Sequence, residues 1–197
     1  MNKAMFSKRL AAFILDVLLV SFCTSLLAIP FTKNDDTITK LNQESKVAYE
    51  KYQKKEISLK TYYVQVVDLE YEITRAEGVT SLITLLITIL YFIVFQFYNK
   101  GQTIGKKVMK IKVVNNDKKK LTINNVVLRS LIINTIVFEM LSLLFAFLGN
   151  KEVFFYASLV TESLQYIIII TTIIMVISRK DGRGLHDFLG NTKVVQE

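Results

Sequence analysis

Six ionisable side chains lie inside or beside long apolar stretches, where a charge needs either a partner or a function. In chain order they are Arg9, Asp16, Arg129, Glu139, His186 and Asp187. An unpaired acid at the centre of a membrane helix costs about 2.5–3.5 kcal/mol on insertion scales, so such a residue is retained for hydrogen bonding, cation binding or proton exchange. These residues are the candidates for an intramembrane or interfacial polar site.

Asp16 interrupts the apolar residues 10–29, and two interpretations of it stay open. It is either a buried hydrogen-bonding node that holds helices together or a titratable, cation-binding group. Arg9 precedes it by seven residues and returns to nearly the same helix face, although a direct contact would have to span about 10 Å. Arg129 is the second possible partner.

The remaining candidates allow the same two kinds of role. Glu139 is expected near the middle of its apolar stretch and is either structural or titratable. Glu162 comes early in another stretch and is expected to be an interfacial acid in contact with water. His186 is more typical of an interfacial residue than of a proton relay.

The composition argues against an enzyme. Cys23 is the only cysteine and His186 the only histidine, which excludes an intrachain disulfide and Cys- or His-rich metal sites. Residues 101–107 resemble a phosphate-binding loop, but three residues instead of four separate the glycines, and Lys107 stands where a serine or threonine is needed. We expect no catalytic residues, no metal and no cofactor.

The elements that must position the polar residues are membrane-spanning helices. The 20 residues 79–98 contain no charge, and a helix of that length spans about 30 Å, the thickness of a bilayer core. Three further apolar stretches qualify with interruptions, at about residues 10–29, 126–148 and 157–177. The first is expected to be retained, because its apolar region is too long for a signal peptide and lacks an Ala-x-Ala cleavage site. The sequence predicts an all-α membrane protein with four transmembrane helices.

The distribution of charge predicts the orientation of these helices. Residues 99–125 contain eight lysines and one acid, a net charge of +7, whereas residues 31–78 contain eight basic and nine acidic residues, a net charge of −1. The positive-inside rule places both termini, residues 99–125 and residues 178–197 in the cytoplasm. Their lysines are expected to contact anionic lipid headgroups rather than nucleic acid.

The segments between the spans have patterns of their own. Apolar residues at helical spacing predict a helical hairpin in the extracytoplasmic residues 31–78, which is either a solvated spacer or, given its five tyrosines, a surface that binds a partner or caps a pore. Alternating residues at 109–114 and 191–195 predict a short two-stranded β element on the cytoplasmic side.

The motifs that surround the polar residues resemble the RDD family of bacterial integral membrane proteins. Similar motifs are found at residues 9–16 (RLAAFILD), 101–106 (GQTIGK) with 111–114, and 184–187 (GLHD) with 192–195. The resemblance implies that Arg9 and Asp16 are the first arginine and aspartate of the family signature. It also implies that Asp187 is the second aspartate.

The resemblance has further implications and some limits. Arg129 stands where an arginine is common at the start of a span. Residues 31–78 are longer than in typical members, and Glu139 and Glu162 match no motif. Such proteins are usually suspected of transport; cation/proton exchange has been proposed for some and regulation of membrane proteases for others.

The sequence therefore predicts a single four-helix domain in a bacterial cell membrane. Its polar centre would contain Arg9, Asp16, Arg129 and Asp187 in the cytoplasmic half. The leading hypothesis is an ion or small-solute transporter coupled to protonation of Asp16, with Glu139 as a further acid. Because four helices form a narrow bundle, we expect a homo-oligomer or a membrane-protein partner. The alternative is a regulator or assembly partner of another membrane protein, acting through the hairpin.

Overall fold

The computed structural model is mostly helical and describes residues 2–31 and 36–197. Three helical segments in this part of the chain are long and apolar enough to cross a membrane. They are α1 (Phe6–Ala28), the continuous run of α4 (Gly78–Ile89), η1 (Leu90–Phe95) and α5 (Gln96–Tyr98), and α9 (Lys151–Ser178). The uncharged composition of residues 79–98 and the aliphatic runs of the other two segments account for these helices.

The fourth candidate span is broken. Helices α7 (Ile123–Ile133) and α8 (Ile136–Leu148) are long enough to cross a membrane only as a pair, and they are bent by 64° at the break between them. Thr135 lies at the break in the left-handed backbone region, with φ of 55°, which a β-branched residue rarely adopts. The predicted span over residues 126–148 is therefore not a single straight helix, and the structure has a fourth span only if this bent pair crosses as one.

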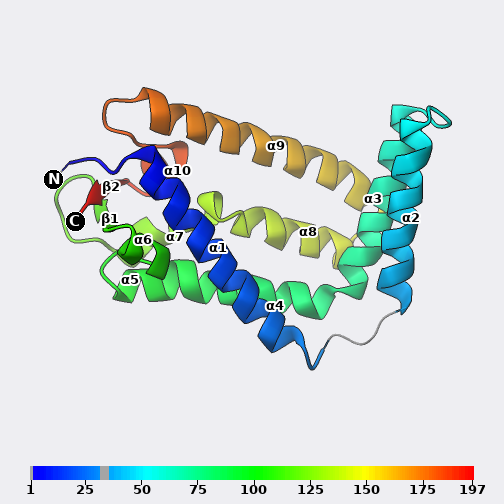
Figure 1. Cartoon of the computed structure of the whole chain (residues 1–197), viewed down its shortest axis with the longest axis horizontal. Coiled ribbons are helices and arrows are strands. Elements are labelled where there is room, and N and C mark those ends of the chain that lie inside the picture. The colour runs from blue at the N-terminus through cyan, green and yellow to red at the C-terminus, as the bar shows by residue number, and fades with distance from the viewer. Residues whose placement is uncertain (1, 32–35) are drawn as a thin grey trace.

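Helices α2 (Asp36–Gln53) and α3 (Leu59–Ala76) lie together at one end of the molecule (Figure 1). They pack against each other, and the rings of Tyr52 and Tyr62 stack with centroids 4.9 Å apart. Helix α3 also packs on α8 and α9, where Tyr71 and Phe154 belong to a buried apolar cluster. Residues 59–76 are thus part of the helical core, and α2 forms the outer layer.

Both termini and the small elements lie at the opposite end (Figure 1). These elements are α6 (Ile104–Val108), β1 (Ile111–Asn115), α10 (Leu185–Leu189) and β2 (Thr192–Gln196). The strands pair antiparallel with Val113 opposite Val194, which confirms the predicted two-stranded element with slightly shifted bounds. The amide of Ala4 donates to the carbonyl of Val194, so the N-terminal segment joins the edge of β2.

The second span contains a stretch of π-helix that the sequence pattern did not predict. The amide of Gln96 donates to the carbonyl of Tyr91, five residues earlier. A π-helical turn inserts an extra residue and changes which side chains face a neighbouring helix. Here it precedes the loop that packs against α1, and Tyr91 and Gln96 both contribute to the polar sites described below.

Candidate functional site

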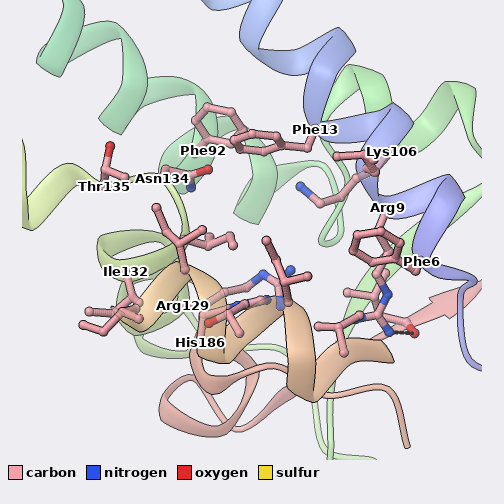
Figure 2. A pocket seen from close by; sticks show the side chains of 18 of the residues that line it. Phe6, Arg9, Phe13, Phe92, Lys106, Arg129, Ile132, Asn134, Thr135 and His186 are labelled. Carbon is pink, nitrogen blue, oxygen red and sulfur yellow. Dashed lines mark hydrogen bonds between the residues drawn. The ribbon is translucent and has the colours of Figure 1, made fainter. Parts of the chain in front are cut away.

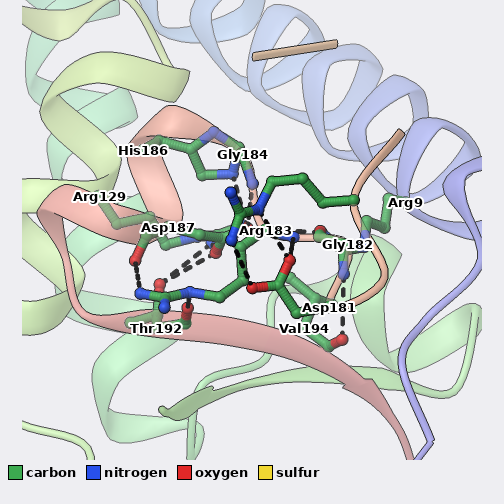
Figure 3. Close-up of polar contacts among 11 residues, drawn as sticks. Arg9, Arg129, Asp181, Gly182, Arg183, Gly184, His186, Asp187, Thr192 and Val194 are labelled. Carbon is green, nitrogen blue, oxygen red and sulfur yellow. Dashed lines mark hydrogen bonds and ion pairs between the residues drawn. The ribbon is translucent and has the colours of Figure 1, made fainter. Parts of the chain in front are cut away.

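Asp187 is the centre of a buried polar cluster that joins three distant parts of the chain (Figure 3). Its side chain is fully buried and forms ion pairs with Arg129 of α7 and with Arg9 of α1, the latter at 3.4 Å. The amide of Gly184, at the N-terminus of α10, donates to the same carboxylate at 3.2 Å, and the hydroxyl of Thr192 donates at 3.0 Å. One acid in the C-terminal segment therefore holds that segment against α1 and α7.

Two arginines of this cluster also donate hydrogen bonds to backbone carbonyls of the C-terminal segment. Arg9 donates to the carbonyls of Gly182 and Val194 at 2.7 and 3.1 Å, and Arg183 donates to the carbonyl of Thr192 at 2.9 Å. The guanidinium of Arg183 also lies 4.1 Å from the centroid of the Phe188 ring, within reach of a cation–π interaction. The cluster thus fixes the short helix and strand at the C-terminus.

Burial and charge set the protonation states in α10. Burial lowers the pKa of His186 to about 3, and neighbouring Arg129 acts in the same direction, so the imidazole is neutral at pH 7. Burial would raise the pKa of Asp187, but the nearby positive charges, Arg129 first, outweigh it and hold that pKa below its ordinary value. Asp187 is therefore a carboxylate and His186 a neutral imidazole.

Asp16 is the centre of a second, neighbouring cluster. Its buried carboxylate accepts hydrogen bonds from the hydroxyls of Tyr91 and Thr103, at 2.6 and 2.5 Å, and from the amide of Gly105 at 2.7 Å. The ammonium of Lys106 lies 3.9 Å away. Gly105 is needed for this approach, because a Cβ there would lie 2.2 Å from the carbonyl oxygen of Ala12.

The structure brings together four of the predicted residues and separates the other two. Arg9, Arg129, His186 and Asp187 lie in one cluster (Figure 3). The sequence leaves Arg9 and Arg129 open as possible partners of Asp16, but among the described residues its partners come from residues 91–106 instead. Glu139 lies in neither cluster.

A cavity of about 270 Å³, here called the inner cavity, lies between these two clusters (Figure 2). Its cationic lining consists of Arg9, Lys106 and Arg129, and His186 also faces it. The remaining wall is mostly apolar and is formed by phenylalanines, leucine and isoleucines of α1, η1, α7 and α9. Burial lowers the pKa of Lys106 to about 8, with a further contribution from Arg129.

A second cavity of about 360 Å³, here called the acidic cavity, lies toward α3. It is lined by Glu70, Glu139 and Glu162 together with hydroxyl groups of α8 and α9. Burial and the charge of Glu162 raise the pKa of Glu70. Thr135, at the break between α7 and α8, lines both cavities.

Sequence reasoning missed several members of these sites. Thr103 and Lys106 lie within the quoted motif at residues 101–106, so that motif was the available signal for them. No sequence pattern indicated Tyr91 and Gln96, which lie in and directly after the π-helical stretch. Residues 2–31 and 36–197 contain no group of three or more His, Cys, Asp or Glu side chains that could hold a metal ion.

Comparison with known proteins gives one match. A family model described as the RDD family matches residues 3–191, nearly the whole chain. No curated protein and no solved structure matches the chain. The matched range includes Arg9, Asp16, Arg129, His186 and Asp187, and it ends just before Thr192 and Val194 of the Asp187 cluster.

Proposed function

The chain belongs to the RDD family, and on that premise we propose that it is a multi-pass membrane protein that transports an ion or a small solute, coupled to protonation of an intramembrane acid. The apolar helices support the membrane location. The charge of residues 99–125 supports an orientation with both termini in the cytoplasm. The inner cavity then lies in the cytoplasmic half of a cell membrane and the acidic cavity in the outer half.

The observation that carries this proposal is the position of Thr135, which lines both cavities at a break between two helices. Irregular backbone at membrane depth is tolerated where protein buries it or where it lines a cavity. Discontinuous helices of this kind form the binding sites of many transporters, at the point where access alternates between the two sides. A small change in the α7–α8 bend would move Thr135 and with it the wall that the two cavities share.

The structure favours Glu139 over Asp16 as the coupling acid. Asp16 already accepts three hydrogen bonds and lies near Lys106, so protonation would disrupt the packing of residues 101–106 against α1. Glu139 is half-buried and lines the acidic cavity, and no hydrogen bond or ion pair of its carboxyl group is found in the described part of the chain. Its free oxygens leave it able to bind a proton or a cation.

Flux through proteoliposomes tests this proposal. Vesicles that contain only this protein and an enclosed pH-sensitive dye would be given a pH gradient, with Na⁺, K⁺ and octanesulfonate offered in turn. Octanesulfonate carries a permanent charge, so it does not cross the bilayer as a neutral acid. We expect proton movement that depends on one of these solutes.

Two glutamate variants separate coupling from general damage. Glu139→Gln keeps the shape of the side chain but cannot titrate, and it should reduce coupled flux to the level of empty vesicles. Glu152→Gln makes the same change at an exposed position in the first turn of α9 and should leave flux unchanged. Equal flux in protein-containing and empty vesicles for all three solutes would refute transport. Unchanged flux in Glu139→Gln would remove Glu139 from the mechanism.

The arrangement of α2 supports the alternative of a regulator or assembly partner. Ala48 is the only buried residue of this helix, and Tyr49 is exposed on it. Replacing residues 37–57 with a flexible linker would leave α3 in the core. A transporter should keep its flux after this replacement, whereas a regulator that acts through α2 should lose its partner.

A further inference from the structure

Four residues that line the inner cavity each have one buried polar atom without a hydrogen-bond partner in the described part of the chain. These atoms are Arg9 Nε, Gln96 Nε2, Thr172 Oγ1 and His186 Nδ1. The residues Gln96, Thr172 and His186 are 1%, 5% and 4% exposed. Because most buried polar groups in native proteins are satisfied, a group of unpaired atoms around one cavity indicates a ligand.

The charges around the inner cavity indicate an anion. Its wall contains the cations Arg9, Lys106 and Arg129. The carboxylates in contact with these cations are Asp16 and Asp187, and His186 is neutral. Three positive charges against two negative charges leave one buried positive charge without compensation, which is costly at low dielectric. Two of the unpaired atoms, Arg9 Nε and Gln96 Nε2, are hydrogen-bond donors, as an anion requires.

The rest of the wall indicates that the ligand also has an apolar part. Leu10 and Phe13 of α1 and Ile173 of α9 line the cavity and are 45%, 40% and 41% exposed. The inner cavity therefore opens to the surface between exposed apolar side chains of two membrane-spanning helices, where lipid chains would lie. Figure 2 shows Phe13 and Phe92 on the side of the cavity opposite Arg129 and His186.

We propose that the inner cavity binds an anionic amphiphile, with its head between Lys106 and Arg129 and its alkyl chain leaving between α1 and α9. A volume of about 270 Å³ corresponds to about nine water-sized groups of about 30 Å³ each, enough for a sulfonate, carboxylate or phosphate head and the first methylenes. The claim that this molecule is transported rests on the proposed function, whereas the claim that it binds in the inner cavity does not.

Binding to the purified, delipidated full chain tests the proposal. Octanesulfonate titrated by calorimetry should bind saturably, at one molecule per chain. Octanol lacks the charge and inorganic sulfate lacks the chain, so neither should compete with it. Because the same head-and-chain chemistry occurs in phospholipids, nanodiscs of phosphatidylglycerol and of phosphatidylcholine would be compared by native mass spectrometry. Phosphatidylglycerol that remains bound and is displaced by octanesulfonate identifies a lipid source, and its failure to bind identifies a free amphiphile.

Two threonine variants provide a matched pair. Thr172→Val removes an unpaired hydroxyl from the inner cavity and should weaken octanesulfonate binding about tenfold, as expected for the loss of a hydrogen bond to a charged group. Thr24→Val removes another buried hydroxyl that has no partner among residues 2–31 and 36–197. Thr24 lies on α1 and does not line the inner cavity, so this variant should leave the affinity unchanged. Equal effects of the two variants would contradict the proposed position of the ligand.

The pH dependence of binding gives a second test that does not require the threonine variants. Because Lys106 has a pKa of about 8, the fraction of chains with a charged ammonium falls by about eightfold between pH 7.5 and 9. The affinity for octanesulfonate should fall by up to the same factor, and Lys106→Arg should remove this dependence. Absence of saturable binding by both octanesulfonate and phosphatidylglycerol would overturn the proposal. Saturable binding without flux would show that the ligand is not a cargo, and would count against the transport function alone.

Discussion

The substitution Asp187→Asn removes the carboxylate shared by two buried guanidinium groups while it keeps the shape of the side chain. Asp187 is fully buried, and the side chains of Arg9 and Arg129 are 11% and 7% exposed. The asparagine could still accept a hydrogen bond from the amide of Gly184. The variant therefore leaves two buried positive charges without their counter-ion.

The expected cost follows from this burial. Breaking a buried ion pair by removing one partner destabilises a protein by about 3–5 kcal/mol, and the hydrogen bond retained by asparagine favours the lower end of that range. Asp181→Asn is the matched control, because Asp181 pairs with Arg179 at 3.0 Å with both side chains at least 40% exposed. An exposed pair of this kind contributes about 0.2–1 kcal/mol.

Unfolding in a mild detergent, followed by circular dichroism, measures both variants. A double-mutant cycle with Arg129→Met isolates the pairwise term, and we expect a coupling energy of at least about 1.5 kcal/mol. If Asp187→Asn destabilises the chain no more than Asp181→Asn, the assignment of Asp187 as the centre of the cluster is wrong. The same conclusion follows if the cycle gives a coupling near zero.

Two further predictions concern pH and topology. Because burial lowers the pKa of His186 to about 3, the unfolded chain binds a proton more readily than the folded chain. The contribution of His186 to the free energy of unfolding should therefore be constant above about pH 6.5 and fall by up to about 1.4 kcal/mol per pH unit below it. Subtracting the free energy of unfolding of His186→Gln from that of the wild type at each pH should give this slope. Lys54 and Lys119 are both exposed, so each can be replaced by cysteine in a Cys23→Ala background. An impermeant thiol reagent applied to intact cells should label Lys54→Cys and not Lys119→Cys. Labelling of position 119 from outside would show that the proposed orientation is wrong.

Features encoded by local patterns were predictable from the sequence. The absence of charge in residues 79–98 and the alternation in residues 109–114 depend on neighbours along the chain, and the structure has a helix and a strand there. A polar centre of Arg9, Asp16, Arg129 and Asp187 was expected with the help of the resemblance to the RDD family, and the structure joins three of these residues but places Asp16 in the neighbouring cluster.

Features that depend on backbone irregularities were not predictable. The partners of Asp16 lie 75 to 90 residues away along the chain, and one of them, Tyr91, lies in the π-helical stretch. The break at Thr135 has no glycine or proline to mark it, and its left-handed backbone contradicts the preference of a β-branched residue. Both irregularities are maintained by packing between helices rather than by local propensity.

The two buried aspartates and Glu139 differ in how completely their oxygens are occupied. The hydroxyls and amide around Asp16, and the guanidinium groups around Asp187, fill the acceptor positions of both aspartates. Such groups stabilise the junction between α1, residues 101–106 and the C-terminal segment, and changing them should reduce stability first. Glu139 and Thr172 line cavities and have polar atoms without a partner among the described residues, so changing them should alter flux or binding while the free energy of unfolding stays nearly constant. The ratio of these two effects in each variant is therefore the measurement that separates the framework of this protein from its functional groups.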